Sequence, residues 1–354
     1  MSQYLESYHG KRILVTGGAG AIGTNLVRKL CESGASLVIV LDDLSSGYRW
    51  NLPSARNLMF AQGDVLDEVK LKRVFFEEPQ IVFHLAAFFA NQNSIDHPEH
   101  DLMTNGMGTL RVLEYSQLTG IERFVYASSG CSIYGSSAPL PLREEFMSMN
   151  LSTPYQITKM LGELYCNFFY NNFKLPVVKT RFFNSYGPGE VPGQYRNVIP
   201  NFIYWALQGK PLPLTGTGEE TRDFTYVEDI VDGLLRAGYF PQAVGQEMNL
   251  ASGAETRIVD LAHWINELTD NKSGIHFLQR RKWDTKSRLL ASVDRAGQLL
   301  GYKPGTPFRE GLANTVAWFR QHWSDIVASA SFQPGMSSAV READEKKGNP
   351  VPTR

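Results

Sequence analysis

A glycine-rich stretch near the start of the chain constrains the fold more than any other feature. Residues 16–23 read TGGAGAIG and directly follow the apolar run Ile13–Val15. Glycines at this spacing, between an apolar strand and the helical pattern that includes Leu26, are typical of a turn that binds the pyrophosphate of a dinucleotide. Such a turn is tight, its backbone approaches the phosphates closely, and the following helix faces them with free N–H groups. We therefore predict a dinucleotide-binding strand, turn and helix.

The second apolar run supports this prediction. It spans residues 36–41 and ends in Asp42 and Asp43, roughly twenty residues beyond the glycines, where an acidic side chain binds the ribose hydroxyls of the dinucleotide. A carboxylate at this place repels the 2′-phosphate of NADP. The sequence therefore favours NAD as the cofactor.

Composition and charge exclude several other classes of protein. The chain has 354 residues, of which 43% are hydrophobic, so it can bury a sizeable core. Its net charge of −1 gives no electrostatic footprint for nucleic acid or for an acidic membrane surface. The cysteines Cys31, Cys131 and Cys166 follow neither a metal-ligand spacing nor a paired framework, so we predict no metal site and a reduced, cytoplasmic setting. The first apolar run is too short for a signal peptide or a transmembrane helix.

The order of the predicted elements indicates an α/β fold. Short apolar runs alternate with amphipathic helical patterns in the first half of the chain, as in a Rossmann-type doubly wound parallel sheet. We expect an NAD-binding domain over residues 10–183, to which later segments return. Residues 184–323 are expected to form mainly a smaller, mixed α/β lobe that binds the substrate. Residues 329–354 lack periodicity and are expected to be a disordered tail.

The carboxyl ends of the predicted strands indicate where a ligand binds, because open α/β sheets bind ligands beyond those ends. By this rule the glycine turn, Asp42, Asp64, residues 85–87 and residues 128–132 converge on one crevice. Tyr155 and Lys159 follow the next helix start, Thr153-Pro154, at positions i and i+4 and thus on one helix face. We interpret them as a catalytic pair rather than a surface pair.

Several motifs together resemble one family. The stretches TGGAGAIG, LDDLSSG, YASSG, YQITK, FFNSYGPG and GTGEETRDFTYVEDI are similar to those of the extended short-chain dehydrogenase/reductase family, in its nucleotide-sugar epimerase, dehydratase and decarboxylase branch. The resemblance covers roughly residues 10–323. It implies a nucleoside-diphosphate sugar as substrate, and a homodimer formed through the helix that carries Tyr155 and the helix around residues 102–118.

The resemblance also implies the binding residues. It assigns Asp64 and Val65 to the adenine and Asp42 to the adenosine ribose. The predicted cofactor-binding set is Gly17, Gly20, Ala21, Ile22, Gly23, Asp42, Asp43, Asp64, Val65, Leu85, Ala86, Ala87, Asn105, Tyr155 and Lys159. The predicted substrate-binding set is Asn184, Val198, Arg222 and Arg288, with Asn184 and Arg222 on the diphosphate.

The predicted catalytic residues are Ser129, Tyr155, Lys159 and, as a hypothesis, Cys131. Tyrosine normally titrates near pH 10, but Lys159 and the positive nicotinamide both favour the phenolate, so Tyr155 could take a proton from a sugar hydroxyl while hydride passes to NAD⁺. Ser129 would hydrogen-bond the same oxygen. The loop SSGCSIYG is one residue longer than is usual in the family, and an alignment from its other end would put Gly130 at the catalytic serine; we prefer Ser129 because the strand fixes that end.

The residues after Ser129 distinguish the reactions of the branch. Dehydratases usually carry an Asp-Glu pair there, and decarboxylases a Glu, whereas this chain has Gly130 and Cys131 or, in the other register, Cys131 and Ser132. We therefore predict an epimerase, acting at C4 through a transient keto-sugar. Alternatives are a decarboxylase, a C3/C5 epimerase in which Cys131, with a pKa lowered beside Lys159, acts as acid or base, and a non-catalytic NAD-binding sensor. Cys131 could also be a simple packing residue.

Overall fold

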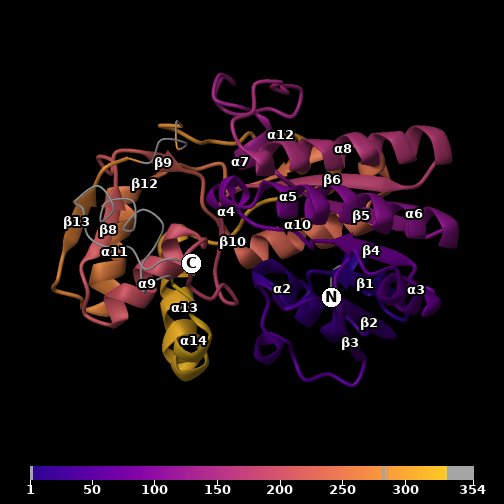
Figure 1. Cartoon of the computed structure of the whole chain (residues 1–354), viewed down its shortest axis with the longest axis horizontal. Coiled ribbons are helices and arrows are strands. Elements are labelled where there is room, and N and C mark those ends of the chain that lie inside the picture. Colours follow the sequence, from indigo (N-terminus) through magenta and orange to yellow (C-terminus); the bar gives the residue numbers. More distant parts are fainter. Residues whose placement is uncertain (1–2, 281–283, 285, 333–354) are drawn as a thin grey trace.

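A seven-stranded parallel sheet organises the part of the chain that the computed structural model describes, namely residues 3–280, 284 and 286–332. The strand order is β11-β6-β5-β4-β1-β2-β3, so the chain starts in the middle of the sheet and winds outward in both directions (Figure 1). The predicted doubly wound Rossmann-type sheet is confirmed. Its strands are β1 (Arg12–Thr16), β2 (Leu37–Asp42), β3 (Leu58–Gln62), β4 (Ile81–His84), β5 (Arg123–Ser129), β6 (Val177–Phe182) and β11 (Glu247–Leu250).

Helices cover both faces of this sheet because alternate side chains of each strand point to opposite sides. Ile13 and Val15 of β1 pack with the apolar stripes of α2, α10 and α12, whereas Leu14 packs with those of α3, α6 and α8. The helices of the sheet domain are α1 (Gln3–Glu6), α2 (Ala21–Glu32), η1 (Arg49–Asn51), α3 (Glu68–Phe76), α4 (Asn91–Asp96), α5 (Pro98–Asp101), η2 (Leu102–Gly108), α6 (Thr109–Thr119), α7 (Gly130–Ile133), α8 (Pro154–Phe173), α10 (Val227–Tyr239), η3 (Pro241–Ala243) and α12 (Asp294–Leu300).

The later part of the chain alternates between this sheet and a smaller lobe. α10, β11 and α12 return to the sheet, while the lobe lies beside its carboxyl edge and has its own apolar core around Phe202, Leu261 and Phe319 (Figure 1). The lobe consists of β7 (Ser185–Tyr186), α9 (Val198–Leu207), β8 (Leu212–Thr215), β9 (Thr221–Arg222), β10 (Thr225–Tyr226), β12 (Thr256–Arg257), α11 (Ile258–Thr269), β13 (Ile275–Leu278), α13 (Phe308–Gln321) and α14 (Trp323–Ser329).

The end of the described chain contacts both parts. Ser329, the last residue of α14, accepts a hydrogen bond on its Oγ from the Trp50 indole at 3.0 Å, and Ser331 forms an isolated bridge with Gly193. The start of the predicted tail is thus packed, while residues 333–354 of that tail lie outside the described residues. None of the helices that the structure describes combines the length and the apolar character needed to cross a membrane.

Candidate active site

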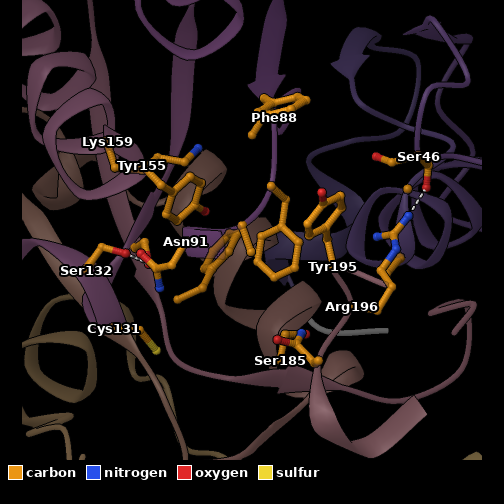
Figure 2. Close-up of a pocket in the computed structure, with 18 of the residues that line it drawn as sticks. Ser46, Phe88, Asn91, Cys131, Ser132, Tyr155, Lys159, Ser185, Tyr195 and Arg196 are labelled. Carbon is orange, nitrogen blue, oxygen red and sulfur yellow. Dashed lines mark hydrogen bonds between the residues drawn. The ribbon is translucent and has the colours of Figure 1, made fainter. Parts of the chain in front are cut away.

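One cavity of about 630 Å³ opens between the carboxyl ends of the parallel strands and the smaller lobe. Its wall includes the glycine turn after β1, the ends of β2, β4 and β5, the start of α8, and residues of α9 and β9. Figure 2 shows Tyr155, Lys159 and Ser132 on one side of this space and Tyr195 and Arg196 on the other. Segments far apart in the sequence therefore meet at the place where open α/β sheets bind their ligands.

The glycine turn is built for close approach of backbone to backbone. Gly17 has a φ of +68°, and a Cβ there would lie 2.6 Å from the Ala86 nitrogen. A Cβ at Gly23 would lie 2.3 Å from the Gly17 carbonyl oxygen, so only glycine fits. Gly20, the N-cap of α2, has no side chain to satisfy the first N–H groups of the helix. The turn and helix start therefore form a cradle for an anion such as a pyrophosphate.

The two acidic residues after β2 are held differently. The Asp42 carboxylate is 7% exposed and accepts hydrogen bonds from the N–H groups of Ala19 and Leu44, both at 2.9 Å. Burial raises the pKa of Asp42, and these N–H donors oppose the rise. The Asp43 carboxylate lies in the more exposed loop and accepts hydrogen bonds from Ser45. Both residues line the cavity, so a ribose hydroxyl could bond to either.

Most of the other residues predicted to bind the cofactor line the cavity, and one of them instead supports a loop of its wall. Asp64, Val65 and residues 85–87 line the cavity, as do Ala21 and Ile22. Asn105 is not among the lining residues: it is 1% exposed and holds the backbone of Phe88 by accepting from its N–H at 2.8 Å and donating to its carbonyl at 3.1 Å. The structure thus places Asn105 one layer behind the wall, where it supports the loop after β4.

His84, at the end of β4, is likewise a supporting residue. Its ring nitrogens lie 2.7 Å from Thr16 Oγ1 and 3.0 Å from Thr109 Oγ1, and burial lowers its pKa to about 3. The neutral imidazole therefore ties β1 to α6 beneath the cavity. Among the described residues, no group of three or more His, Cys, Asp and Glu side chains is placed to hold a metal ion.

Ser129, Tyr155 and Lys159 come together at the cavity. Ser129 lies close enough to Tyr155 for its hydroxyl to lower the pKa of the phenol, and Lys159 Nζ lies 5.7 Å from the centroid of the Tyr155 ring. Lys159 Nζ also donates to the carbonyl of Ala127 at 2.9 Å. Pro154 begins α8 and Thr153 caps it, which fixes the start of the helix that carries both residues.

The electrostatics of this group show how much the protein alone contributes to the ionisation of Tyr155. In the structure the pKa of Tyr155 is raised rather than lowered, first because the phenol is buried and then because Asp101 and Cys131 lie near; only Ser129 opposes the rise. Burial also lowers the pKa of Lys159 to about 8, against the opposing effect of Asp101 and Glu163. Lys159 alone is therefore not enough to favour the phenolate, and a further positive charge is required.

Cys131 lies in the cavity wall, but its environment also differs from the prediction. Burial raises the pKa of the Cys131 thiol, and the basic residues that oppose the rise are Lys286 and Arg222, not Lys159. The Cys131 sulfur accepts a hydrogen bond from the Asn184 N–H at 3.4 Å. In the protein alone, desolvation outweighs the nearby charges, so the thiol pKa is raised where the hypothesis, which included NAD⁺, expected it to be lowered.

The predicted substrate residues separate in the structure. Asn184, Val198 and Arg222 line the cavity. Arg288 is not among the lining residues: its side chain is 57% exposed and pairs with Glu255. The basic residue of this segment that does line the cavity is Lys286, whose Nζ donates to the carbonyl of Cys131 at 2.8 Å. In this structure Lys286, two residues before Arg288, is thus the basic side chain of the segment that reaches the cavity.

Several lining residues had no predicted role. They include Lys286, residues 88–91 of the loop after β4, and the Tyr195-Arg196 pair, whose Arg196 guanidinium bonds to the Ser46 carbonyl in the loop after β2 (Figure 2). Ser132 falls within the predicted crevice, but it had no role of its own. The loop could have been found from the rule that ligands bind at strand ends, since Phe88 to Asn91 directly follow the small residues after β4. No local motif marks Lys286 or Arg196.

The match to known proteins extends over most of the chain. The model of the NAD dependent epimerase/dehydratase family matches residues 13–251. The UDP-glucose 4-epimerase of Mycolicibacterium smegmatis is 36% identical over 87% of this chain and 98% of that protein. A UDP-glucuronic acid decarboxylase of Xenopus tropicalis is 32% identical over 90% of this chain and 74% of that protein. Both reactions thus occur among the relatives.

Solved structures agree with this assignment. Epimerase Mth375 of Methanothermobacter thermautotrophicus superposes with a TM-score of 0.92, at 56% identity, over 93% of this chain and 98% of that one. The UDP-glucose 4-epimerase of Thermotoga maritima, solved with UDP-glucose, has a TM-score of 0.84 at 34% identity, over 88% and 99% of the two chains. NAD is the cofactor of the family, and the glycine cradle and acidic strand end described above fit it. The chain belongs to the NAD-dependent epimerase/dehydratase family.

Proposed function

We propose that this protein is an NAD-dependent epimerase that inverts C4 of a nucleoside-diphosphate sugar through a transient keto-sugar. One observation carries the proposal: Ser129, Tyr155 and Lys159 meet in a cavity that also contains the glycine cradle and Arg222, while neither residue pair after Ser129 holds a carboxylate. The cavity can therefore remove a proton from a sugar hydroxyl, but no carboxylate follows Ser129 at the place where dehydratases of this branch carry the acid that expels water.

The side chains at the end of β5 and on α8 perform the proton transfer. Tyr155 accepts the proton of the C4 hydroxyl, and Ser129 hydrogen-bonds the same oxygen and keeps it in line. Lys159 supplies a positive charge that favours the phenolate. Bound NAD would supply the hydride acceptor and donor beside the sugar carbon and a positive ring that favours the Tyr155 phenolate. Because Tyr155 is buried, each proton it takes returns to the sugar rather than to water.

The cofactor is assigned to the sheet side of the cavity. The N–H groups at the start of α2 would hold its pyrophosphate, Asp42 or Asp43 its adenosine ribose, and Asp64 and Val65 its adenine. The substrate's diphosphate is assigned to the lobe side, where Asn184, Arg222 and Lys286 supply donors. Arg222 already pairs with Asp284 at 2.9 Å, so the diphosphate would share or replace that carboxylate as its partner.

The alternatives receive less support. A decarboxylase of this branch usually has a Glu where this chain has Cys131 or Ser132. Cys131 retains its proton at neutral pH because burial raises the thiol pKa, so it is a poor base for epimerisation at C3 or C5. A non-catalytic NAD sensor has no need of the complete group formed by Ser129, Tyr155 and Lys159.

A panel of nucleotide sugars tests the proposal. Purified protein loaded with NAD is incubated with UDP-, dTDP-, CDP- and GDP-linked hexoses, hexuronic acids and pentoses, and the products are separated and weighed by mass spectrometry. We expect an isomer of unchanged mass, differing at C4, from at least one sugar, and none from Tyr155→Phe. Loss of carbon dioxide or water would move the assignment to the other reactions of the branch, and no reaction with any sugar would favour the sensor.

We also propose that the protein forms a homodimer through α8 and the neighbouring segment of η2 and α6. Large apolar side chains on these helices are exposed, among them Met103, Met107, Ile157, Leu164 and Phe168. Burying such a face against a second copy is favourable. Light scattering should give twice the chain mass for the wild type and the single mass for Leu164→Glu. Val69→Glu, which changes an exposed residue of α3, should stay dimeric; a monomeric wild type would contradict this proposal.

A further inference from the structure

Ser132 belongs to a chain of three buried hydroxyl groups. Its Oγ lies 2.9 Å from Ser129 Oγ. Ser129 in turn lies close enough to Tyr155 for its hydroxyl to lower the pKa of the phenol. Ser132 is fully buried, while Ser129 and Tyr155 are 8% and 7% exposed, and all three line the cavity. Ser132 and Tyr155 project from α7 and α8 toward the same side of it (Figure 2).

We propose that Ser132 is a positioning residue: it donates to Ser129, so that Ser129 donates to Tyr155 and holds the phenol oxygen in its proton-accepting state. This inference rests on the function proposed above, because it assigns Tyr155 the role of the base. It adds a residue that acts through Ser129: the hydrogen bond of the Ser132 side chain is to Ser129.

The number of protons in the chain gives the direction of these bonds. A phenolate has no proton and can only accept, so Ser129 must donate its single proton to Tyr155 whenever Tyr155 is ionised. The Ser129 oxygen then has lone pairs to spare, and Ser132 is the hydroxyl within reach that can donate to it. When Tyr155 is protonated, the three hydroxyl groups carry three protons but form only two hydrogen bonds with one another, so one proton has no acceptor within the chain. The chain therefore stabilises the ionised form more than the neutral form, and bonds in series reinforce one another.

The fold fixes Ser132 in this place. Gly130 packs so closely on Phe183 that a Cβ there would lie 1.9 Å from the ring, which brings α7 down onto β6. Beyond α7, the Tyr134 hydroxyl accepts a hydrogen bond from Arg181 at 3.0 Å and donates to Asn249 at 2.7 Å. The additional residue in the loop after β5 is thus accommodated by a glycine.

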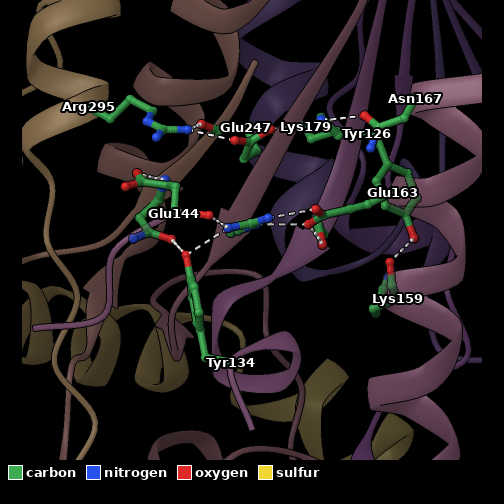
Figure 3. Close-up of polar contacts among 12 residues, drawn as sticks. Tyr126, Tyr134, Glu144, Lys159, Glu163, Asn167, Lys179, Glu247 and Arg295 are labelled. Carbon is green, nitrogen blue, oxygen red and sulfur yellow. Dashed lines mark hydrogen bonds and ion pairs between the residues drawn. The ribbon is translucent and has the colours of Figure 1, made fainter. Parts of the chain in front are cut away.

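A buried ion pair anchors the other end of the same loop. Arg181 and Glu163 form two hydrogen bonds, of 3.0 and 2.8 Å, with both side chains at most 3% exposed (Figure 3). Glu163 also accepts from Ser128 Oγ at 2.5 Å. Arg181 therefore connects, directly or through Glu163, to residues at both ends of the segment that carries Ser129 and Ser132. A rigid loop can hold a hydroxyl in line at small entropic cost.

Several other groups near Tyr155 disfavour its ionisation, and the hydroxyl chain has to oppose them. Asp101 from α5 and Cys131 from α7 disfavour the phenolate, and Tyr126 from β5 interacts with Tyr155 from below. Lys159, on the same helix as Tyr155, carries a positive charge 5.7 Å from the centroid of the Tyr155 ring. Asp101 and Glu163 raise the pKa of that lysine, and the lysine in turn helps to lower the pKa of His84. Ser129, polarised by Ser132, is the hydrogen-bond donor that favours ionisation.

The titration of Tyr155 tests this proposal without any sugar. Protein loaded with NAD is labelled with tyrosine carrying ¹³C at Cζ, whose chemical shift reports ionisation, and Tyr155→Phe assigns the signal. We expect Ser132→Ala to raise the pH at which Tyr155 ionises by roughly half to one unit, and Ser132→Thr to restore it. Ser116→Ala removes a hydroxyl that is also fully buried, bonded to Val112 O at 2.6 Å in α6, and should change nothing.

Each other result overturns the proposal. It fails if Ser132→Ala leaves the Tyr155 midpoint unchanged or lowers it, or if wild-type Tyr155 stays protonated up to the pH at which the protein unfolds. Should Ser132→Ala not fold, Ser132→Cys, a weaker donor, must give a smaller shift in the same direction. If a substrate is found, the pH at which kcat is half-maximal must shift with the midpoint while KM stays constant. If no nucleotide sugar of the panel reacts, the proposed function is contradicted, but the titration of Tyr155 can still be measured and interpreted.

Discussion

The two sides of the cavity are built on different principles. On the cofactor side, backbone geometry dominates: Gly17 and Gly23 leave no room for a Cβ, and Asp42 is held by two N–H groups of nearby turns. On the substrate side, long side chains from remote segments meet. Arg222 pairs with Asp284, and Lys286 reaches a carbonyl 155 residues earlier in the chain.

This difference explains which side a sequence can reveal. A turn that accepts only glycine leaves a local mark, because the constraint acts between residues six positions apart. A lysine that reaches Cys131 across the fold leaves none. The predictions below test this contrast, and they run from the largest expected effect to the smallest.

Tyr155 is the point where the two sides meet, so its loss should have the largest effect. Tyr155→Phe removes the proposed base and little packing, and we expect turnover to fall by about 10²–10⁴-fold. NAD should stay bound, because the cradle is untouched. Turnover and NAD released by acid extraction measure both quantities. Loss of NAD together with turnover would mean that Tyr155 acts mainly through cofactor binding.

The backbone constraint of the cofactor side is tested at Gly23. Gly23→Ala places a Cβ 2.3 Å from the Gly17 carbonyl oxygen, a backbone atom that cannot move aside. We expect the free energy of unfolding to fall by about 1–3 kcal/mol and copurified NAD to be lost. Thermal unfolding and NAD content check this. Gly297→Ala is the matched control: it lies within α12 with its nearest neighbour at 3.7 Å, and it should be neutral or stabilising.

Two arginines test the substrate side, because sequence motifs pointed to both. Arg222 lines the cavity, whereas Arg288 is exposed and pairs with Glu255. Loss of a charge-assisted bond to a diphosphate corresponds to roughly 10–100-fold in affinity. Arg222→Ala should therefore raise KM for the nucleotide sugar by about that factor, while Arg288→Ala leaves KM unchanged. Equal effects of the two variants would show that cavity lining does not identify the diphosphate site.

The pH dependence of stability tests the support beneath the cavity. The folded protein keeps His84 neutral down to a pKa of about 3, whereas an unfolded histidine binds its proton near pH 6.5. Between these pH values the unfolded state binds more protons, so the free energy of unfolding must fall as the pH drops. His84→Gln should flatten this acid slope in denaturant titrations. His276→Gln, a change at an exposed residue, should leave the slope as it is.

The parallel sheet and most of the residues that line the cavity could be predicted from the sequence. The apolar run Ile13–Val15 lies within β1, because a strand in the middle of a parallel sheet is buried on both faces and therefore has consecutive apolar residues. The site residues that sequence misjudged depend on three-dimensional contacts: Asn105 faces Phe88 rather than the cavity, and the thiol of Cys131 is governed by burial. The pKa of Tyr155 belongs to the same class, since desolvation is invisible in a motif.

The most direct test of the account follows hydrogen during the reaction. The sugar identified by the panel is turned over in deuterium oxide by NAD-loaded protein, and the epimer is analysed by mass spectrometry and NMR. Inversion at C4 through bound NAD predicts an epimer without carbon-bound deuterium, because the hydrogen that leaves C4 returns to C4. Deuterium at the carbon beside the keto group would contradict the account and favour epimerisation at C3 or C5.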